Sequence, residues 1–300
     1  MRNAYLSVAA SGALAAGMCL AMAPVESASA GIDLDTPEGA VAAMRRIMCS
    51  ENDNEPTTYW WNGHMFSRVP GEPDRRLFRV EGMNVRQCVT VEDPDRGTGY
   101  RLVTREILLY KDPDTHEVLW EWDNPWTGET VEVMHIANDP VNGRPTFPYD
   151  ADGNPSARFN AEVQGNKWWM TVTVPLFYEN PLGGDYQEWV GNKYQATEMF
   201  NFMGRVSELT AADRPIYHPH VGWVRQSDWL PWMKMRGRAG LVYFHTAGRK
   251  LESFEDLSDT MREAIDEHWP EYTEPPPGDD DRPNETSWTY FKKMVDARDE

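Results

Sequence analysis

The sequence contains little cysteine and only a minority of positive charge. It has 3 cysteines in 300 residues, and 29 lysines and arginines against 48 aspartates and glutamates, which gives a formal net charge of −19 at pH 7. So acidic a chain repels the phosphates of nucleic acids and an anionic membrane surface, and we therefore expect neither as a partner. The charge does not choose between small ligands.

Several motifs of cofactor and nucleophile chemistry are also missing. The sequence has no Gly-rich phosphate loop, no dinucleotide fingerprint and no internal repeat. No serine lies in a nucleophile-elbow context, and Cys88 has no identifiable activating partner, so covalent catalysis by either residue type is not favoured. We therefore expect a protein that works without a cofactor.

An apolar run near the N-terminus predicts export. Arg2 supplies a positive start, residues 8–23 are apolar, and Pro24 ends the run. Ala28, Ser29 and Ala30 form a small-residue cleavage site. The run is shorter than the roughly 20 residues that span a bilayer, although a retained anchor is the alternative interpretation. We expect a signal peptide over residues 1–30, cleaved after Ala30, and a periplasmic or secreted protein with no membrane contact after cleavage.

Residues 31–300 are long enough to bury a sizeable core, as one large β domain or as two small ones. Residues 274–285 are rich in Pro and Asp and predict an exposed loop rather than a linker, because only a short segment follows them. An oxidising compartment permits a disulfide between Cys49 and Cys88. The sequence does not give the distance between them in space, so it does not decide whether they are bridged.

Extended segments dominate the chain. Residues 76–90, 99–110 and 193–204 are strand candidates, with two shorter ones near 222–225 and 241–245. Two hairpins are predicted as well. In the first, Val118, Trp120 and Trp122 alternate with Glu117, Leu119 and Glu121. The chain then returns through Val131, Val133 and His135. In the second, residues 159–163 lead through Gly165 into 168–174.

Two helices are predicted at the ends of this β-rich region. Thr36 and Pro37 begin a short helix, and a later apolar stripe that includes Met261 and Ile265 stops at Pro270. About eight strands with short connections favour a sandwich or a barrel, and a barrel of that size removes exposed edges and can hold one small ligand. We expect a mainly β fold, an antiparallel β-barrel with a lipocalin-like cup and a few flanking helices.

Six segments together resemble the bacterial and fungal family DUF1838. They are GMNVR at 82–86, LYKDP at 109–113, WDNPWTG at 122–128, NDPVN at 138–142, WLPWM at 229–233 and SWTYF at 287–291. The resemblance covers nearly all of the chain after residue 30 and implies one domain. It implies no catalytic residue, because the family is defined as a domain of unknown function.

Three residues are the candidates for acid–base chemistry. His135 ends a strand just before Asp139. It can exchange a proton near neutral pH while Asp139 or a backbone carbonyl holds its ring. Glu106 falls among apolar neighbours on one strand face, where burial would raise its pKa. A hydrogen-bonded core histidine and a simple ion pair are the alternative interpretations.

Arg101 and Arg105 share the opposite strand face from Glu106, because side chains alternate along a strand. If that face looks inward, the two guanidiniums would bind a carboxylate or steady an oxyanion; if it looks outward, they form a solvated stripe. Further residues predicted to line the cup are Tyr110, Trp120, Trp122, Asn138, Tyr178 and Glu198.

His218 and His220 are two residues apart, a spacing that can chelate a metal in an extended segment. A convincing site needs a third ligand, such as His64 or His245, and nothing in the sequence brings one close. We therefore predict no metal centre, with a metalloprotein as the third hypothesis.

The residues favour an exported, cofactor-independent enzyme, a lyase or isomerase that uses acid–base chemistry on a small apolar or aromatic molecule. The alternative is a non-catalytic periplasmic protein that binds a lipophilic molecule in the same cup.

Overall fold

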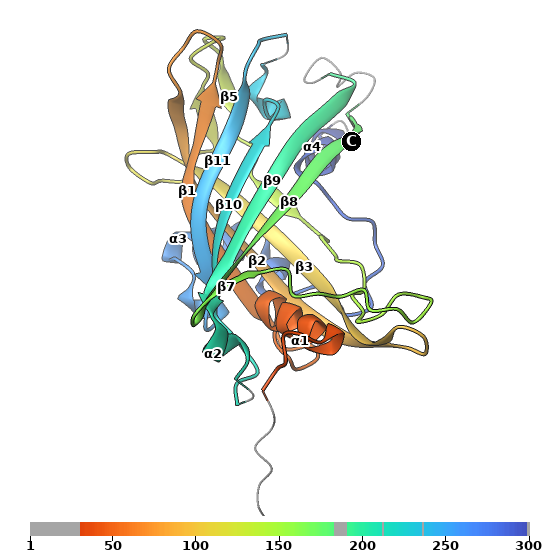
Figure 1. Ribbon diagram of the computed structural model, residues 1–300. Coiled ribbons are helices and arrows are strands. Elements are labelled where there is room, and N and C mark those ends of the chain that lie inside the picture. Colours follow the sequence, from red (N-terminus) through yellow and green to blue (C-terminus); the bar gives the residue numbers. More distant parts are fainter. Residues whose placement is uncertain (1–30, 183–190, 212, 236, 299–300) are drawn as a thin grey trace, which may run out of the picture. The chain divides into compact units, whose positions relative to one another are not determined.

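The computed structural model describes residues 31–182, 191–211, 213–235 and 237–298, so the predicted signal peptide lies outside the described residues (Figure 1). Within the described ranges, the main sheet is antiparallel and nine-stranded, in the order β6-β3-β2-β1-β11-β10-β9-β8-β7. The strands are β1 (Thr57–Arg68), β2 (Arg75–Asp93), β3 (Gly97–Lys111), β6 (Ile136–Asn138), β7 (Glu162–Gln164), β8 (Lys167–Glu179), β9 (Lys193–Arg205), β10 (His220–Ser227) and β11 (Leu241–Lys250), with β4 (Glu121–Asp123) and β5 (Thr130–Glu132) in a separate hairpin.

Few helices accompany the sheet. They are α1 (Pro37–Met48), α2 (Val206–Leu209), α3 (Asp259–His268) and α4 (Ser287–Asp296), with the short 3-10 helices η2 (Pro231–Met233), η3 (Phe254–Asp256) and η4 (Pro270–Thr273). None of the helices in the described part of the chain has the length and apolar character needed to cross a membrane. The mainly β architecture with a few helices is confirmed.

The large sheet does not close into a barrel within the described residues. Its hydrogen-bonded order ends at β6 on one side and at β7 on the other. Beyond β6, the segment that follows occupies the edge of β3: the N–H of Val141 donates to the carbonyl of Thr104 over 2.8 Å, and the N–H of Gly143 donates to that of Leu102 over 2.9 Å. These bonds use groups that a closing strand would need.

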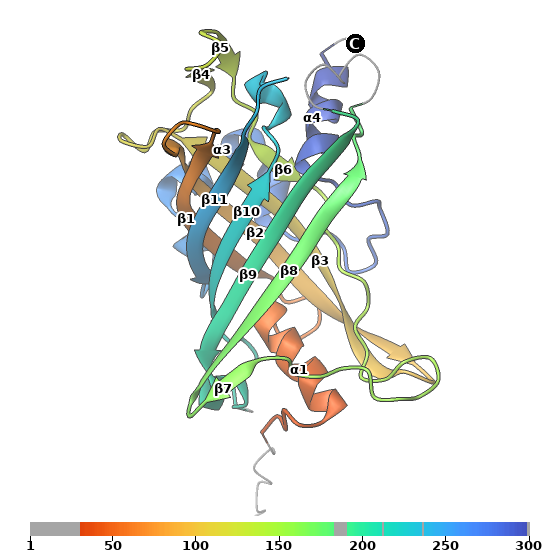
Figure 2. The same cartoon turned by 45° about the horizontal axis from the view of Figure 1, so that its top comes forward.

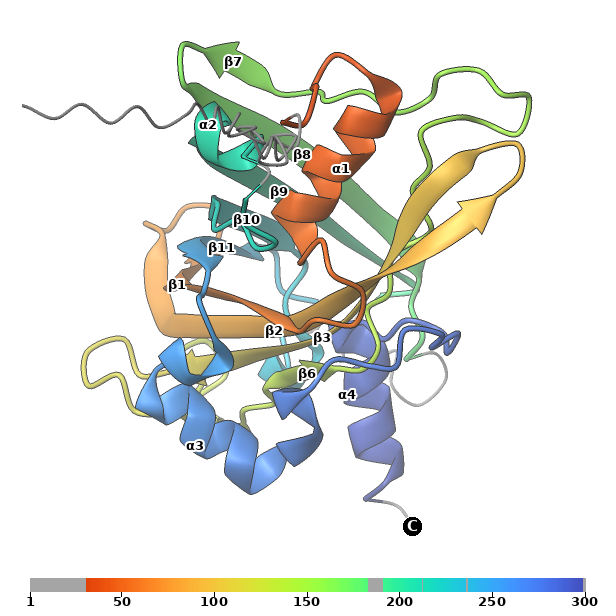
Figure 3. The same ribbon diagram turned by 90° about the horizontal axis from the view of Figure 1, so that it is seen from below.

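The sheet is curved, and Figure 3 shows it bending around α1. Side chains alternate between its faces, so even-numbered residues of β2, β3, β8 and β9 and odd-numbered residues of β1 and β10 share the concave side. One end of this side holds an aromatic core that includes Phe78, Tyr110 and Trp232. At the other end, Ala43 and Ile47 of α1 pack against inward residues of β1, β8, β9 and β10.

A helix cap, a lysine from β11 and a disulfide stabilise α1 and the turn after it. Thr36 caps its first turn by accepting a hydrogen bond from the N–H of Gly39 at 3.1 Å, as the sequence predicted. At its other end, the ammonium of Lys250 donates to the carbonyls of Arg46 and Cys49 over 2.7 and 2.9 Å. The disulfide that the sequence left open is present between Cys49 and Cys88.

The convex side of β1, β2 and β3 is covered by α3 and η4. Met261 and Ile265 of the predicted stripe are buried against Met83 and Val85, and the helix ends before Pro270 as predicted. Figure 2 shows α3 behind β1 and β11. The following segment, 274–285, is a loop but is not wholly exposed, because Gln87 donates to the carbonyl of Pro276 over 2.6 Å and Asp280 is buried.

Both predicted hairpins are present, but the first is short. Trp122 pairs with Val131, so their side chains share a face, and Gly128 takes a positive φ of 74° in the turn. The second joins β7 to β8 around Gly165. The reading of the sequence missed β1, because Asn62, Gly63 and His64 interrupt its apolar alternation.

Candidate functional site

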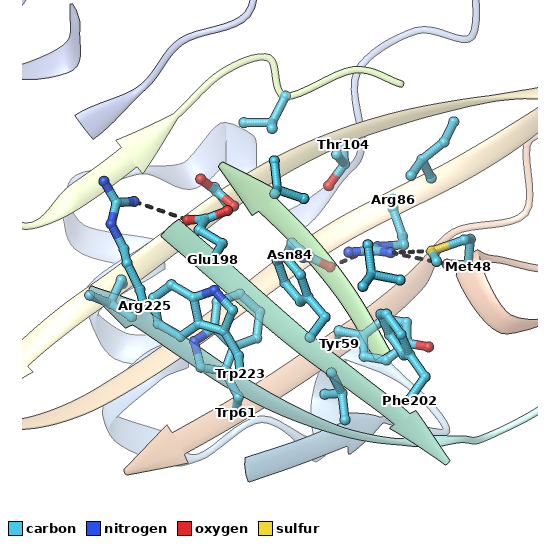
Figure 4. A pocket seen from close by; sticks show the side chains of 18 of the residues that line it. Met48, Tyr59, Trp61, Asn84, Arg86, Thr104, Glu198, Phe202, Trp223 and Arg225 are labelled. Carbon is cyan, nitrogen blue, oxygen red and sulfur yellow. Dashed lines mark hydrogen bonds and ion pairs between the residues drawn. The ribbon is translucent and has the colours of Figure 1, made fainter. Parts of the chain in front are cut away.

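A cavity of about 350 Å³ lies on the concave side of the sheet, between the aromatic core and α1. Its lining comes from β1, β2, β3, β6, β8, β9 and β10, with Met48 from the end of α1. This size is within the range of small-molecule sites. We call this cavity the cup, and Figure 4 shows its interior.

Aromatic side chains form much of the wall of the cup. They are Tyr59, Trp61, Phe200, Phe202 and Trp223. Trp61 and Trp223 meet edge to face with ring centroids 6.1 Å apart. The partner of Trp61 on β2 is Gly82, and a Cβ on that glycine would lie 2.3 Å from the indole. A glycine at this point therefore lets the Trp61 ring lie across the sheet.

Two carboxyl groups enter this apolar cup from opposite sides. Glu106 comes from β3, and its Oε1 accepts a hydrogen bond of 2.6 Å from the amide of Asn138. Glu198 comes from β9 and is ion-paired with Arg225, its neighbour on β10, at 3.0 Å. Burial and the negative charge of Glu198 raise the pKa of Glu106. The two acids therefore have different partners, one an amide and the other a guanidinium.

Arg86 brings a positive charge to the other end of the cup. Its Nε donates to the amide oxygen of Asn84 over 2.8 Å, and its guanidinium carbon lies 4.6 Å from the centre of the Tyr59 ring. A longer hydrogen bond of 3.4 Å reaches the carbonyl of Met48. Burial lowers the pKa of this guanidinium. Figure 4 shows Tyr59 and Phe202 on the side of Arg86, and Trp61 and Trp223 on the side of Glu198.

Of the residues predicted from sequence, Glu106 and Glu198 line the cup, and Asn138 contacts Glu106 directly. The structure thus brings together one predicted acid and two predicted ligand-binding residues from three separate strands.

Arg101 and Arg105 lie on the other face of β3, and Asp139, which follows β6, lies beside Arg105. The guanidinium of Arg105 pairs with Asp139 at 2.8 Å and donates to the carbonyl of Glu271 over 2.6 Å, while Arg101 donates to the carbonyl of Asp280. Their face looks outward, but it is not the solvated stripe that this orientation suggested. Residues 271–282, which we call the C-terminal segment, cover this face, and their backbone carbonyls accept hydrogen bonds from both guanidiniums.

His135 is buried outside the cup, next to the aromatic core. Its Nδ1 accepts a hydrogen bond of 3.1 Å from the N–H of Tyr110, and its ring lies 4.7 Å from that of Trp120. Burial and the nearby charge of His268 lower the pKa of His135 to about 3. The imidazole is therefore neutral at pH 7, and the structure does not bring it together with Glu106 or Asp139.

The remaining predicted cup residues are aromatic and lie elsewhere. Tyr110 is fully buried in the aromatic core, and Trp122 packs against it through Phe78 and Trp232. Trp120 and Tyr178 are 45% and 52% exposed, so they lie at the surface.

The sequence reading missed Tyr59, Trp61, Asn84, Arg86 and Arg225. Asn84 and Arg86 share their strand face with Phe78 and Val80, and this alternation within 76–90 was a usable signal. Tyr59 and Trp61 have no such signal, because the apolar alternation of β1 is interrupted after Trp61.

The described ranges hold no group of three or more His, Cys, Asp or Glu side chains arranged for a metal ion. His218 lies 3.1 Å from Glu252.

Fold and site together define a class: an open, curved antiparallel sheet whose concave side holds an aromatic cup with half-buried carboxyl groups and two guanidinium groups. The family model described as "Protein of unknown function (DUF1838)" matches residues 54–295, and the chain belongs to that family. No curated protein matches the chain.

Proposed function

We propose that this protein is an acid–base enzyme of the lyase or isomerase type, which works without a cofactor on a small apolar or aromatic molecule bound in the cup. The observation that supports it is the pair of inward carboxyl groups with unequal partners. Enzymes that move protons commonly hold two titratable groups in environments that separate their pKa values.

Glu106 is the proposed proton carrier. It has no cation within ion-pair distance among the described residues, and burial among apolar side chains raises its pKa toward the neutral range in which an acid–base group works best. Glu198 is ion-paired with Arg225, so this pair lies beside the proposed reacting group. His135 remains a predicted base, but its burial outside the cup favours Glu106 for this role.

The surroundings suit this chemistry. In the proposed arrangement the curved sheet acts as a lipocalin-like cup, with α1 at one end and the aromatic core at the other. The tryptophan and phenylalanine rings offer an apolar substrate a large contact area and limit the water around the carboxyl pair. We further propose that the protein works in the periplasm or is secreted, after cleavage at Ala30.

The test is turnover in a screen of apolar and aromatic small molecules with purified protein. Glu106→Gln keeps the shape and the hydrogen bond to Asn138 but cannot carry the proton, so we expect a loss of about 100-fold or more. Glu81→Gln is the control, because Glu81 is a carboxyl on the same sheet but lies buried on the convex side. Rates are compared per folded molecule.

Turnover that survives Glu106→Gln but is lost in His135→Asn would contradict the assignment of Glu106. A lipophilic molecule that co-purifies, is released unchanged and is never turned over would support the binding protein, which the apolar lining of the cup also suits.

A further inference from the structure

We propose that the ligand of the cup is an apolar or aromatic carboxylic acid, and that Arg86 binds its carboxylate at the end of the cup next to α1. This inference adds a substrate class to the proposed function and rests on that function only for the claim that the bound acid is turned over. The anion site itself follows from the partners of Arg86.

All the direct partners of Arg86 are neutral. They are the amide of Asn84, the backbone carbonyl and thioether of Met48, and the ring of Tyr59. No carboxylate lies within ion-pair distance of this guanidinium in the described part of the chain, whereas Arg225 at the other end of the cup has Glu198. Arg86 is half-buried. A charge held among apolar side chains is normally paired, because leaving it uncompensated is costly.

A second cation lies on the same aromatic ring. The ammonium of Lys250 is 5.6 Å from the centre of the Tyr59 ring; unlike Arg86 this lysine is fully buried, and within the described residues it makes hydrogen bonds only to backbone carbonyls. Burial and then the positive charges of Arg86 and Arg46 lower the pKa of Lys250. Two basic side chains thus lie against one ring, and neither has a carboxylate within ion-pair distance among the described residues, which favours an anion at this end of the cup.

The free part of the guanidinium suits a carboxylate. Nε and Nη1 make the hydrogen bonds just described, and Nη2 has none within the described residues. A planar guanidinium is the side chain best matched to a carboxylate, and a charge-assisted bond of this kind is roughly twice as strong as a neutral one.

The strand register defines the ligand further. Arg86 pairs with Thr104, and Asn84 pairs with Glu106, so the two charged positions are one inward step apart along β2 and β3. One such step is about 7 Å along a strand. The acid would therefore bind in a single orientation, with its carboxylate on Arg86, away from Glu106 and Glu198, and its apolar body against the rings.

The experiment compares naphthoate, an aromatic carboxylate, with naphthamide, its neutral isostere, by calorimetric titration of the mature protein at pH 7. We expect naphthoate to bind wild type about tenfold more tightly or better, as one charge-assisted hydrogen bond implies. Arg86→Met should bring the two affinities together. Arg79→Met should keep the preference, because Arg79 is on the same strand but on the convex face, where it contacts Asn62.

Arg86→Gln provides a second test, since it can keep the bond to Asn84 and should fold if Arg86→Met does not; it too should lose the preference. No naphthoate binding by wild type, equal affinities for the two probes, or a preference that survives both Arg86 variants would overturn the anion site.

Glu106→Gln separates this inference from the proposed function. We expect that variant to keep the preference for naphthoate while it loses turnover. If the protein prefers naphthoate but shows no turnover, the proposed enzyme function is wrong and the anion site is supported. If turnover depends on Glu106 but the protein has no preference for naphthoate, the anion site is wrong and the enzyme function is supported.

Discussion

At the scale of single residues, the protein tolerates several ionisable groups where charge is costly. Glu106 has only an amide as its direct partner, and His135 is 3% exposed among aromatic rings. Each of these groups makes the stability of the fold depend on pH, because its pKa differs between the folded and unfolded states.

We predict that Glu106→Gln stabilises the protein at pH 7. The pKa of Glu106 is raised in the folded state from its usual 4.5, so the folded state holds a proton that the unfolded state has released. Stability therefore falls as the pH rises from 4.5 to the folded pKa and stays lower above it. Glutamine avoids this loss. Urea unfolding should show the variant to be the more stable at pH 7 and equal to wild type near pH 4; a variant that is weaker at pH 7 would refute this.

The contribution of His135 to stability depends on pH in the opposite direction. Its pKa is lowered to about 3 in the folded state from 6.5, so acid protonates the unfolded chain first and stability is lost as the pH falls below 6.5. We expect wild type to lose roughly 2 kcal/mol between pH 6.5 and pH 5 through this group. In His135→Asn the amide can still accept from Tyr110, and the loss should be absent. Parallel unfolding curves for the two proteins across this range would speak against it.

At the scale of elements, α1 forms one end of the cup. Its C-terminal residue, Met48, contacts Arg86. The hydroxyl of Tyr59 donates to the carbonyl of Ile47 over 2.5 Å, and Lys250 and the disulfide at Cys49 hold the following turn. The anchors of α1 thus come from β1, β2 and β11, so movement of this helix would disturb the guanidinium end of the cup first.

The disulfide should contribute measurably to this anchoring. Cys49 and Cys88 are 39 residues apart, and closing a loop of that length stabilises a fold by about 4 kcal/mol in the chain-entropy model. We expect the double variant Cys49→Ala and Cys88→Ala to lose most of that free energy of unfolding and to bind naphthoate more weakly. Chemical denaturation and calorimetry measure the two effects, and reduced wild type is the control. Unchanged stability would show that the other anchors suffice.

A second set of anchors acts on α3. Ser258 caps this helix, and its hydroxyl also donates to Glu81, which in turn pairs with Lys111 at 2.9 Å. Removing one member of such a buried ion pair commonly lowers the free energy of unfolding by about 3–5 kcal/mol. We expect Glu81→Gln to unfold at lower urea than wild type while the affinity of the folded protein for naphthoate stays the same, because α3 lies on the convex side. A weaker affinity at full folding would show that the two sides are coupled.

At the scale of the whole molecule, the two faces of the sheet have different roles, one in packing and the other in forming the cup. Its convex face carries ion pairs and apolar contacts to α3 and the C-terminal segment, and its concave face carries the cup. The strongly negative charge keeps such a chain soluble.

Export is the prediction that belongs to this scale. We expect the full-length chain, expressed in a Gram-negative host, to reach the periplasm as a protein that begins at Gly31, because the small residues before it form the cleavage site. Intact-mass measurement of the periplasmic fraction checks this. An alanine-to-arginine change at Ala30 should block the cleavage, and a full-length mass from membranes in the wild type would indicate a retained anchor instead.

Much of the architecture could be predicted from the sequence because its signals are local. Alternation in 76–90 and 99–110 predicted the long strands, and capping residues such as Thr36 and Pro270 marked helix ends. The same alternation predicted that Glu106 and Arg105 point to opposite faces of one strand, and the structure has them so.

The concave side could not be predicted, because period-two alternation defines two faces without saying which one encloses a space. Curvature and long-range pairing decide that: β1 meets β11, whose residues lie far along the chain, and together they bring Tyr59 and Lys250 to Arg86. The sequence by itself determined most of the strands, their two faces and the family. Only the tertiary structure sealed His135 into the aromatic core, gave Arg105 to the C-terminal segment and left Glu106 in the cup.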